Sequence, residues 1–285
     1  MNYQLSGSML ETKEQKHHGI ILPIFASLVM IMIGDFILMG FGFSEGATEP
    51  SMGENLASLY IDIVPIILVL LFCQLFEKRS LSSLGLQKSG ILQKYGLGML
   101  IGFLMIGATF LSNVLLKGIE ISDNFDHINW LFVLLIFVGY TIQGLSEELI
   151  CRGMLMNGIA AKKGVWAGVI GNSLFFAVLH LLSPGVTVIS FMNILFFGLL
   201  FSYIFYKTNN IFVVAALHSV WNFFQGIIFG SEVSGLSSFS SIFKSIPVAG
   251  KDLLSGGSFG FEGGIVTTFV LIATFIIFKI VYKKR

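Results

Sequence analysis

Two adjacent glutamates, Glu147 and Glu148, follow an almost wholly apolar stretch, Trp130–Tyr140, in a part of the chain where a membrane-spanning helix should carry no charge. Arg152 comes four residues after the second glutamate. A carboxylate inside a bilayer costs roughly 3 kcal/mol or more, so an ionisable residue at that depth indicates a function. These glutamates are therefore the first candidates for chemistry in this sequence.

The spacing along the helix gives the two glutamates different surroundings. Residues four apart share a helix face, so Glu148 and Arg152 are expected to form an ion pair that lowers the cost of keeping both charges near the membrane. Glu147 is rotated by about 100° from Glu148 and has no obvious partner on its own helix. Glu147 is therefore the stronger candidate for a catalytic carboxylate.

A helical hairpin supplies a partner for Glu147. A turn is expected at Lys162-Lys163-Gly164, and Glu147 and His180 lie at nearly equal sequence distances on either side of it. In an antiparallel hairpin such residues lie side by side, here at the same depth and roughly 20–25 Å from the turn. Phe176 precedes His180 by one turn on the same face and would shield it. The sequence therefore predicts that Glu147 and His180 meet.

A further helix carries His218 and Asn222, which are four residues apart and share a face. A carboxylate with an imidazole can activate water. A second imidazole and an amide can donate hydrogen bonds to a developing oxyanion. Glu147, His180 and His218 could instead bind a divalent metal such as Zn²⁺, as the His₂Glu sets of zinc peptidases do. The parts for peptide hydrolysis are present, and the residues leave open whether a metal takes part.

The composition predicts the elements that position these residues. The chain has 285 residues, of which 55% are hydrophobic and only 12% charged, and this excludes an ordinary soluble protein. Runs of about 20 apolar residues can cross a hydrocarbon core of about 30 Å. We predict an all-α polytopic membrane protein that forms one integral membrane domain over residues 1–285. Eight spans are expected, at about residues 19–43, 56–76, 94–116, 128–150, 164–182, 186–206, 209–229 and 264–282.

Basic residues are sorted between the two sides of these spans. With both termini and the even-numbered loops on one side, that side holds 14 Lys and Arg and the other holds three. The 14 are Lys13, Lys16, Lys78, Arg79, Lys88, Lys94, Arg152, Lys162, Lys163, Lys207, Lys279, Lys283, Lys284 and Arg285, and the three are Lys117, Lys244 and Lys251. The positive-inside rule makes the richer side cytoplasmic. We therefore expect a multi-pass protein of the cell membrane with both termini in the cytoplasm.

The remaining features point to no second chemistry. Residues 231–262 are rich in Gly and Ser and are expected to form a flexible extracytoplasmic loop with one interfacial helix. Asp35 and Asp62 lie within the first two spans and are expected to pair with polar neighbours or line a cavity. Cys73 and Cys151 lie near cytoplasmic ends, where thiols stay reduced, so no disulfide is expected. Basic residues lie scattered at helix ends, which gives no indication of nucleic-acid binding.

Three motifs occur in order on the expected membrane helices. Residues 147–152 read Glu-Glu-Leu-Ile-Cys-Arg, residues 176–180 read Phe-Ala-Val-Leu-His, and residues 218–222 read His-Ser-Val-Trp-Asn. As EExxxR, FxxxH and HxxxN they resemble the CAAX prenyl endopeptidase and bacteriocin-processing (CPBP, or Abi) family of intramembrane proteases. The segment 203–222 also looks like that family. The resemblance covers about residues 128–226, which would be the catalytic core.

The resemblance implies a role for each catalytic candidate. Glu147 would be the general base that activates water, and His180 would assist that water. His218 and Asn222 would stabilise the oxyanion. The family is often called metalloprotease, although its eukaryotic prenyl-protein members look glutamate-dependent without an obligatory metal. If a metal is present, its ligands would be Glu147, His180 and His218.

The resemblance also implies supporting residues. Glu148 and Arg152 would hold the site together or recognise the substrate, and Phe176 would pack beside it.

The motifs of other intramembrane protease classes are absent. The chain has no HExxH, which excludes a zinc protease of that type. Gly144-Leu145-Ser146-Glu147 is not the GxSG of rhomboids, and Ile33-Gly34-Asp35 lacks the first glycine of GxGD.

The sequence therefore predicts an intramembrane endopeptidase, in a bacterial plasma membrane, with a cavity open toward the cytoplasmic leaflet. Bacteria lack ordinary CAAX prenylation, so the expected substrate is a peptide pheromone, a bacteriocin leader or a small membrane protein. The alternative is a non-catalytic membrane regulator or bacteriocin self-immunity protein that binds a peptide or a partner. A transporter is a weaker alternative, since it would be expected to show repeats or broken helices.

Overall fold

The fold is a bundle of helices. The computed structural model describes residues 4–15, 19–43 and 49–282. Its α-helices are α1 (Gly7–Glu14), α2 (Ile21–Gly40), α3 (Met52–Tyr60), α4 (Ile63–Leu71), α5 (Ile91–Leu115), α6 (Trp130–Glu148), α7 (Asn157–Lys163), α8 (Val165–Leu179), α9 (Val188–Thr208), α10 (Ile211–Phe223), α11 (Asp252–Ser255) and α12 (Ile265–Val281). π-Helical turns follow α4, α6 and α10, at Phe72–Phe76, Leu149–Met156 and Phe224–Ile228.

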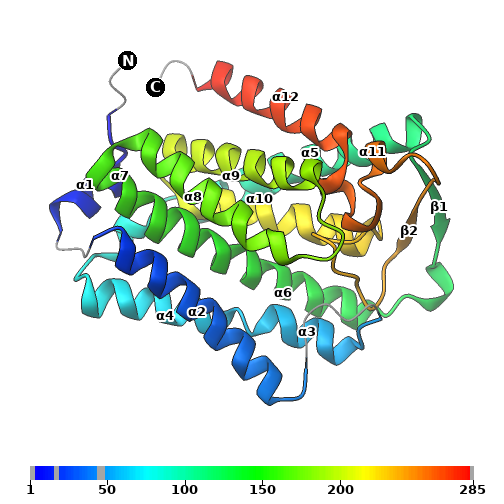
Figure 1. The fold of residues 1–285 in the computed structure, drawn as a ribbon, viewed down its shortest axis with the longest axis horizontal. Coiled ribbons are helices and arrows are strands. Elements are labelled where there is room, and N and C mark those ends of the chain that lie inside the picture. Colours follow the sequence, from blue (N-terminus) through cyan, green and yellow to red (C-terminus); the bar gives the residue numbers. More distant parts are fainter. Residues whose placement is uncertain (1–3, 16–18, 44–48, 283–285) are drawn as a thin grey trace.

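The remaining elements are short. The 3₁₀ helices are Leu81–Leu84, Phe125–His127, His180–Leu182, Gly257–Phe259 and Phe261–Gly263, and the strands are β1 (Ile119–Asp123) and β2 (Phe243–Pro247). Figure 1 shows the long helices running roughly along the longest axis of the molecule. Helices α1 and α7 lie at one end of the bundle, and β1, β2 and α11 lie at the other.

The expected membrane spans are present, with one of them short. Seven helical runs in the described part of the chain are long and apolar enough to cross a membrane, at Ile21–Gly40, Met52–Phe76, Ile91–Leu115, Trp130–Lys163, Val165–Leu182, Val188–Thr208 and Ile211–Ile228. The expected eighth span, 264–282, forms α12, an apolar helix of 17 residues. About 17 residues is the lower limit for a transmembrane helix. The chain is an all-α polytopic membrane protein.

The hairpin between the fourth and fifth spans forms where the sequence predicts it. Gly164 ends α7 with φ +89°, a backbone conformation that favours glycine, and α8 begins at the next residue. The two helices then pack closely, because a Cβ on Gly168 would lie only 2.6 Å from the carbonyl oxygen of Met156. This close packing of α8 against α7 and the π-helix fixes the depth of the residues on both arms.

The polar N-terminal segment forms α1, which packs on the end of the bundle that carries α7. Met9 is fully buried there, and the backbone N–H of Ser8 donates to Oδ1 of Asn209, 2.8 Å away. Thr12 accepts a hydrogen bond from the guanidinium of Arg79. Arg79 is itself buried and ion-paired with Glu77 at 2.9 Å. A helix and a buried ion pair therefore close this end of the molecule.

The π-helix Leu149–Met156 interrupts the long fourth span directly after the two glutamates. A π-helix frees backbone carbonyls from the usual i→i−4 pattern, and such turns are frequent at functional sites. Here Nη2 of Arg79 donates to the carbonyl oxygen of Gly153, 3.1 Å away. Gly153 also lets the chain approach closely, because a Cβ would lie 3.0 Å from the carbonyl oxygen of Leu84. Arg79, Glu77 and Thr12, which together form the Arg79 cluster, thus support the helix that carries the glutamates.

The Gly- and Ser-rich segment 231–262 is folded, in contrast to the flexible loop expected from its composition. β2 pairs antiparallel with β1, and Phe259 and Phe261 are buried, with exposures of 0% and 1%. Gly260 has φ +85°, and a Cβ on it would lie 1.9 Å from the carbonyl oxygen of Glu232. Close approach between backbones explains the glycine content here. Its one α-helix, α11, is a short turn of four residues.

Helix α10 is the central helix of the bundle and the most buried of the seven spans. It packs mainly against α5 and α6. Glycines permit this close contact, since a Cβ on Gly98 would lie 2.1 Å from the carbonyl oxygen of Val213 and one on Gly144 would lie 2.4 Å from Oγ of Ser219. Helices α6 and α10, which carry the expected site residues, are therefore held rigidly side by side.

Candidate functional site

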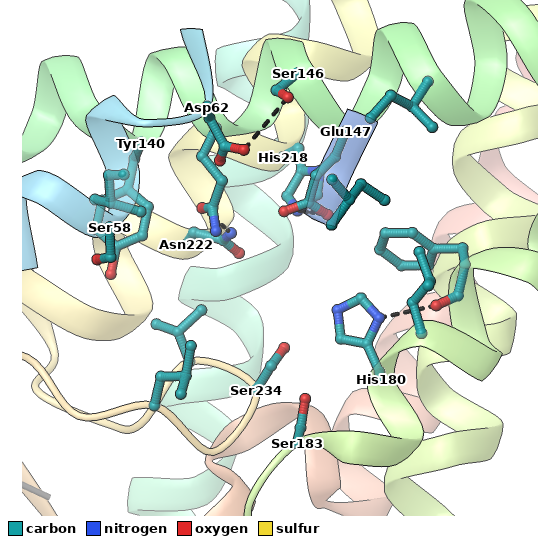
Figure 2. Close-up of a pocket in the computed structure, with 18 of the residues that line it drawn as sticks. Ser58, Asp62, Tyr140, Ser146, Glu147, His180, Ser183, His218, Asn222 and Ser234 are labelled. Carbon is teal, nitrogen blue, oxygen red and sulfur yellow. Dashed lines mark hydrogen bonds and ion pairs between the residues drawn. The ribbon is translucent and has the colours of Figure 1, made fainter. Parts of the chain in front are cut away.

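A cavity of about 700 Å³ lies within the bundle. All four candidate catalytic residues line it: Glu147, His180, His218 and Asn222. They come from α6, the end of α8 and α10, so the fold brings together three motifs that are far apart in sequence. In Figure 2, Glu147, His218 and Asn222 lie on one wall, and His180 lies across the cavity from them.

His218 is held between the two glutamates. Its Nδ1 lies 3.0 Å from Oε1 of Glu148, and its Nε2 lies 3.9 Å from Oε2 of Glu147. Because an ionised carboxylate can only accept, Nδ1 carries a proton and donates it to Glu148. The ring is thereby fixed in one orientation, with Nε2 presented toward Glu147.

Glu148 and Arg152 form the ion pair that their spacing predicts. Nη1 of Arg152 lies 3.0 Å from Oε1 of Glu148, and both side chains have 0% exposure. Nη2 of Arg152 donates to the carbonyl oxygen of Gly198. The rings of Phe176 and Phe201 flank the guanidinium at 5.1 and 5.5 Å. The pair lies behind the cavity wall, because neither Glu148 nor Arg152 is among the residues that line the cavity.

Glu147 differs from its neighbour in exposure and in partner. Its side chain is 27% exposed and lines the cavity. The sequence predicted that it would meet His180, but no ion pair joins the two within the described residues, and the histidine nearest to Glu147 is His218. Hairpin geometry sets the depth of a residue, whereas its direction depends on the helix face. In the structure Glu147 and His180 both line the cavity, and the carboxylate of Glu147 turns toward α10.

His180 begins the 3₁₀ turn that ends α8. Its Nδ1 lies 2.8 Å from the carbonyl oxygen of Phe176 and therefore donates to it. In the neutral ring this tautomer leaves Nε2 as an acceptor, and Figure 2 shows that this second nitrogen faces the cavity. The Phe176 ring also packs on the imidazole, with ring centroids 4.6 Å apart. Phe176 thus contacts His180 with both its carbonyl and its ring.

Asn222 is oriented by Gln143, a residue that none of the three motifs contains. Its Nδ2 donates to Oε1 of Gln143, 3.1 Å away, and both residues line the cavity. This bond uses one of the two amide N–H groups and leaves the other available. Gln143 precedes Glu147 by four residues on the same helix, so the helical repeat was the signal that could have identified it.

A second missed residue, Glu262, comes from the folded segment after α10. It is 4% exposed and lines the cavity. Nε1 of Trp221, a residue inside the third motif, donates to its Oε1 at 3.2 Å, and Ser234 donates to its Oε2 through both N and Oγ. Burial raises the pKa of Glu262, while the hydrogen bond from Ser234 and the nearby His180 oppose that rise. Glu262 lies in a Gly-rich stretch, and nothing in the sequence around it indicates that it lines the cavity.

Asp35 and Asp62 line the same cavity. The sequence predicted either this or a pairing with polar neighbours. Oγ of Ser146 donates to Oδ1 of Asp62 at 3.4 Å. Asp35 comes from α2, which closes one side of the cavity and packs against α4. The two aspartates therefore belong to the surroundings of the site.

The two histidines have hydrogen-bond partners of the kind that metal ligands have. Nδ1 of each histidine bonds to a carbonyl or carboxylate oxygen, which is the contact that metal-binding histidines make. The described residues nevertheless contain no group of three or more His, Cys, Asp or Glu side chains placed to hold a metal ion. Glu147, His180 and His218, as they lie here, do not fit a metal.

The comparison with known proteins gives a match to a protein family. None of the curated proteins searched matches this chain. Residues 129–224 match the sequence model of a family described as type II CAAX prenyl endopeptidase Rce1-like. This segment runs from the start of α6 to the end of α10 and contains all three motifs together with the four catalytic candidates. Over this segment the chain is similar to the CPBP/CAAX family of membrane proteases.

Proposed function

We propose that the chain is an intramembrane endopeptidase that cleaves a peptide or a membrane-associated protein. The observation that carries the proposal is the opposition of Glu147 and His180 across one cavity, each with a free atom facing it. Glu147 presents a part-exposed carboxylate. His180 presents Nε2, because its Nδ1 is bound to the Phe176 carbonyl. A water between them can donate one proton to each acceptor.

In the proposed reaction, the oxygen of this water attacks the carbonyl carbon of the peptide bond while Glu147 takes its proton. General-base catalysis of this kind contributes about 10²–10⁴-fold to the rate. The free amide N–H of Asn222, and Nε2 of His218 when that nitrogen is protonated, donate to the oxyanion that forms. The C–N bond then breaks, and Glu147 returns the proton to the leaving amine. Glu148 acts through His218 by fixing its ring.

The cavity supports a peptide as the substrate. It has about 700 Å³ of space and a lining that mixes apolar side chains, such as Phe197 and Ile194, with the polar groups described above. Pockets of about 300–1,000 Å³ with few placed polar groups are typical of small-molecule and peptide-sized ligands. We propose no nucleic acid as a partner. The bilayer surrounds the helices, and the proposed location is a bacterial plasma membrane.

The test uses the purified full-length chain on a library of quenched fluorescent peptides. We expect Glu147→Gln to lower kcat by about 10²–10⁴-fold. A matched control is Glu120→Gln, which removes an exposed carboxylate on β1, away from the cavity, and should leave the rate unchanged. Equal cleavage by wild type and Glu147→Gln would contradict the role proposed for Glu147. Cleavage by neither would contradict the protease proposal and favour a non-catalytic regulator or immunity protein.

A further inference from the structure

The two ends of the bundle differ in charge. One end carries α1, α7 and the C-terminal ends of α9 and α12. It holds Lys13, Lys162, Lys163, Lys207 and Lys279. The opposite end, which carries β1, β2 and α11 in Figure 1, holds only Lys117, Lys244 and Lys251 among its described residues. We name these the basic end and the strand end. The positive-inside rule places the basic end in the cytoplasm and the strand end outside it.

The cavity extends from the middle of the bundle to the strand end. Ser183 and Pro184 line it from the turn after α8, and Ser234 and Ser237 line it from the folded segment. Asn55 lines it from the first turn of α3 and accepts a hydrogen bond from the backbone N–H of Phe239. Among the described residues that line the cavity, none comes from the loops at the basic end, 77–90, 163–164 and 209–210.

The opposite direction is closed by a packed core. Between the candidate catalytic residues and the basic end lie Met154, Leu155, Met156, Ile211 and Val214, all with exposures of 1% or less. Helix α1 and the buried Arg79 cluster cover this core from the basic end. A peptide reaching the site from the cytoplasm would have to break through this layer, whereas the strand end offers a polar rim.

We infer that the cavity receives its substrate from the extracytoplasmic side, an inference that rests on the proposed protease function for its chemistry. The substrate class is then an exported peptide, or the outward-facing flank of a membrane-anchored one. A prenylated cytoplasmic C-terminus does not fit this geometry. The cavity opening expected from the sequence, toward the cytoplasmic leaflet, is the reverse of what the lining residues indicate.

The geometry is tested by cysteine labelling in intact cells that express the full-length chain. Cys73 is fully buried, whereas Cys151 is 2% exposed and lines the cavity, so the wild-type chain is labelled in parallel to measure the background from the native thiols. We compare Ser58→Cys inside the cavity and Ser237→Cys at its rim with Lys163→Cys, an exposed position at the basic end. The reagent is a small, charged methanethiosulfonate that does not cross membranes.

We expect Ser58→Cys and Ser237→Cys to react in intact cells, and Lys163→Cys to react only after permeabilisation, with rates at least tenfold apart. Reaction of Lys163→Cys in intact cells would overturn the assigned sidedness. Reaction of Lys163→Cys and Ser237→Cys as expected, with Ser58→Cys unreactive from outside, would overturn the outward opening of the cavity. Neither result depends on catalysis.

A second measurement separates this inference from the proposed function. Quenched peptides that are cleaved by the purified protein are added to sealed vesicles of either orientation. We expect cleavage in right-side-out vesicles and at least a tenfold lower rate in inverted ones, with Glu147→Gln inactive in both. Glu147-dependent cleavage confined to inverted vesicles would overturn the outward opening and leave the protease proposal standing. Labelling of the cavity from outside, without Glu147-dependent cleavage, would overturn the protease proposal and leave the outward opening standing.

Discussion

Nδ1 of His218 lies 3.0 Å from Oε1 of Glu148, inside a part of the bundle where Glu148 has no exposure to solvent. The same carboxylate oxygen also accepts from Arg152. One buried carboxylate thus holds both a catalytic candidate and the cation that neutralises its own charge. We therefore propose that the second glutamate of the motif positions His218, whereas its neighbour Glu147 reaches the cavity.

This relationship predicts that Glu148→Gln is damaging in two ways. The substitution leaves Arg152 as a buried cation without its counter-charge, and breaking a buried pair costs about 3–5 kcal/mol. It also removes the carboxylate that orients His218, so kcat should fall. Thermal unfolding in detergent measures the first effect. Glu147→Gln is the control, because its part-exposed side chain should leave stability within about 1 kcal/mol of wild type. Equal unfolding temperatures for both variants would contradict this account.

The bond between Asn222 and Gln143 predicts coupled effects on catalysis. Asn222→Ala removes a proposed oxyanion donor, so kcat should fall about 10²–10³-fold with little change in KM. Gln143→Ala should give a smaller fall, because it only loosens the Asn222 side chain. The double variant should be no slower than Asn222→Ala alone, as a double-mutant cycle would show. Fully additive losses would mean that Gln143 acts independently of Asn222.

Substitutions at Phe176 and at His180 should separate effects on catalysis from effects on stability. His180→Ala should lower kcat by about 10²–10⁴-fold and leave the unfolding temperature nearly unchanged, because His180 is only half-buried. Phe176→Leu keeps the main-chain carbonyl that holds His180 but removes the ring beside Arg152. Loss of that cation–π contact should cost about 0.5–2 kcal/mol of stability, with most activity retained per folded molecule. The reverse pattern would refute these roles.

Glu262 predicts a pH dependence of stability. Burial raises its pKa above the ordinary value of 4.5, so the folded chain binds this proton more tightly than the unfolded chain does. The contribution of Glu262 is therefore most favourable below the ordinary value and declines as pH rises through the raised one. Unfolding temperatures recorded from about pH 4 to about pH 8 should show this decline in wild type. Glu262→Gln should lack it, and identical curves would contradict the assignment.

Metal dependence is checked by chelation. Because the described residues form no cluster of metal ligands, we expect peptide cleavage by the purified protein to survive prolonged treatment with a strong chelator. The control is a zinc peptidase treated in parallel, which should lose its activity. Loss of cleavage by this chain, followed by recovery when Zn²⁺ is restored, would show that Glu147, His180 and His218 rearrange to bind a metal.

Local spacing predicted much of the fold and the site. The apolar runs gave the helices within a few residues of their bounds, because a span must be both long and apolar. Glu148 and Arg152 pair as the helical repeat requires. The turn at Gly164 lies where two lysines and a glycine end one apolar run and begin another. Each of these predictions depends only on residues that are near one another in sequence.

Other features could not be predicted because they depend on contacts between distant segments. Which histidine faces Glu147 is decided by the rotation of α10 against α6, and no spacing within either helix reports that rotation. Glu262 acquires its role from Trp221 and Ser234, which reach it only after the segment has folded. The sequence predicts that the same segment is flexible, because a high glycine content occurs both in tightly packed backbones and in mobile loops.

The π-helix at Leu149–Met156 makes the length of the chain at this point as important as its side chains. A π-helical turn accommodates an additional residue relative to an α-helix. A deletion of one residue within α7, after the π-helix, has no such turn to absorb it and would rotate everything before it by about 100° relative to α8. Glu147 would then leave the cavity although every motif residue were still present. A homologue that keeps all three motifs but differs by one residue here would have lost its catalytic register.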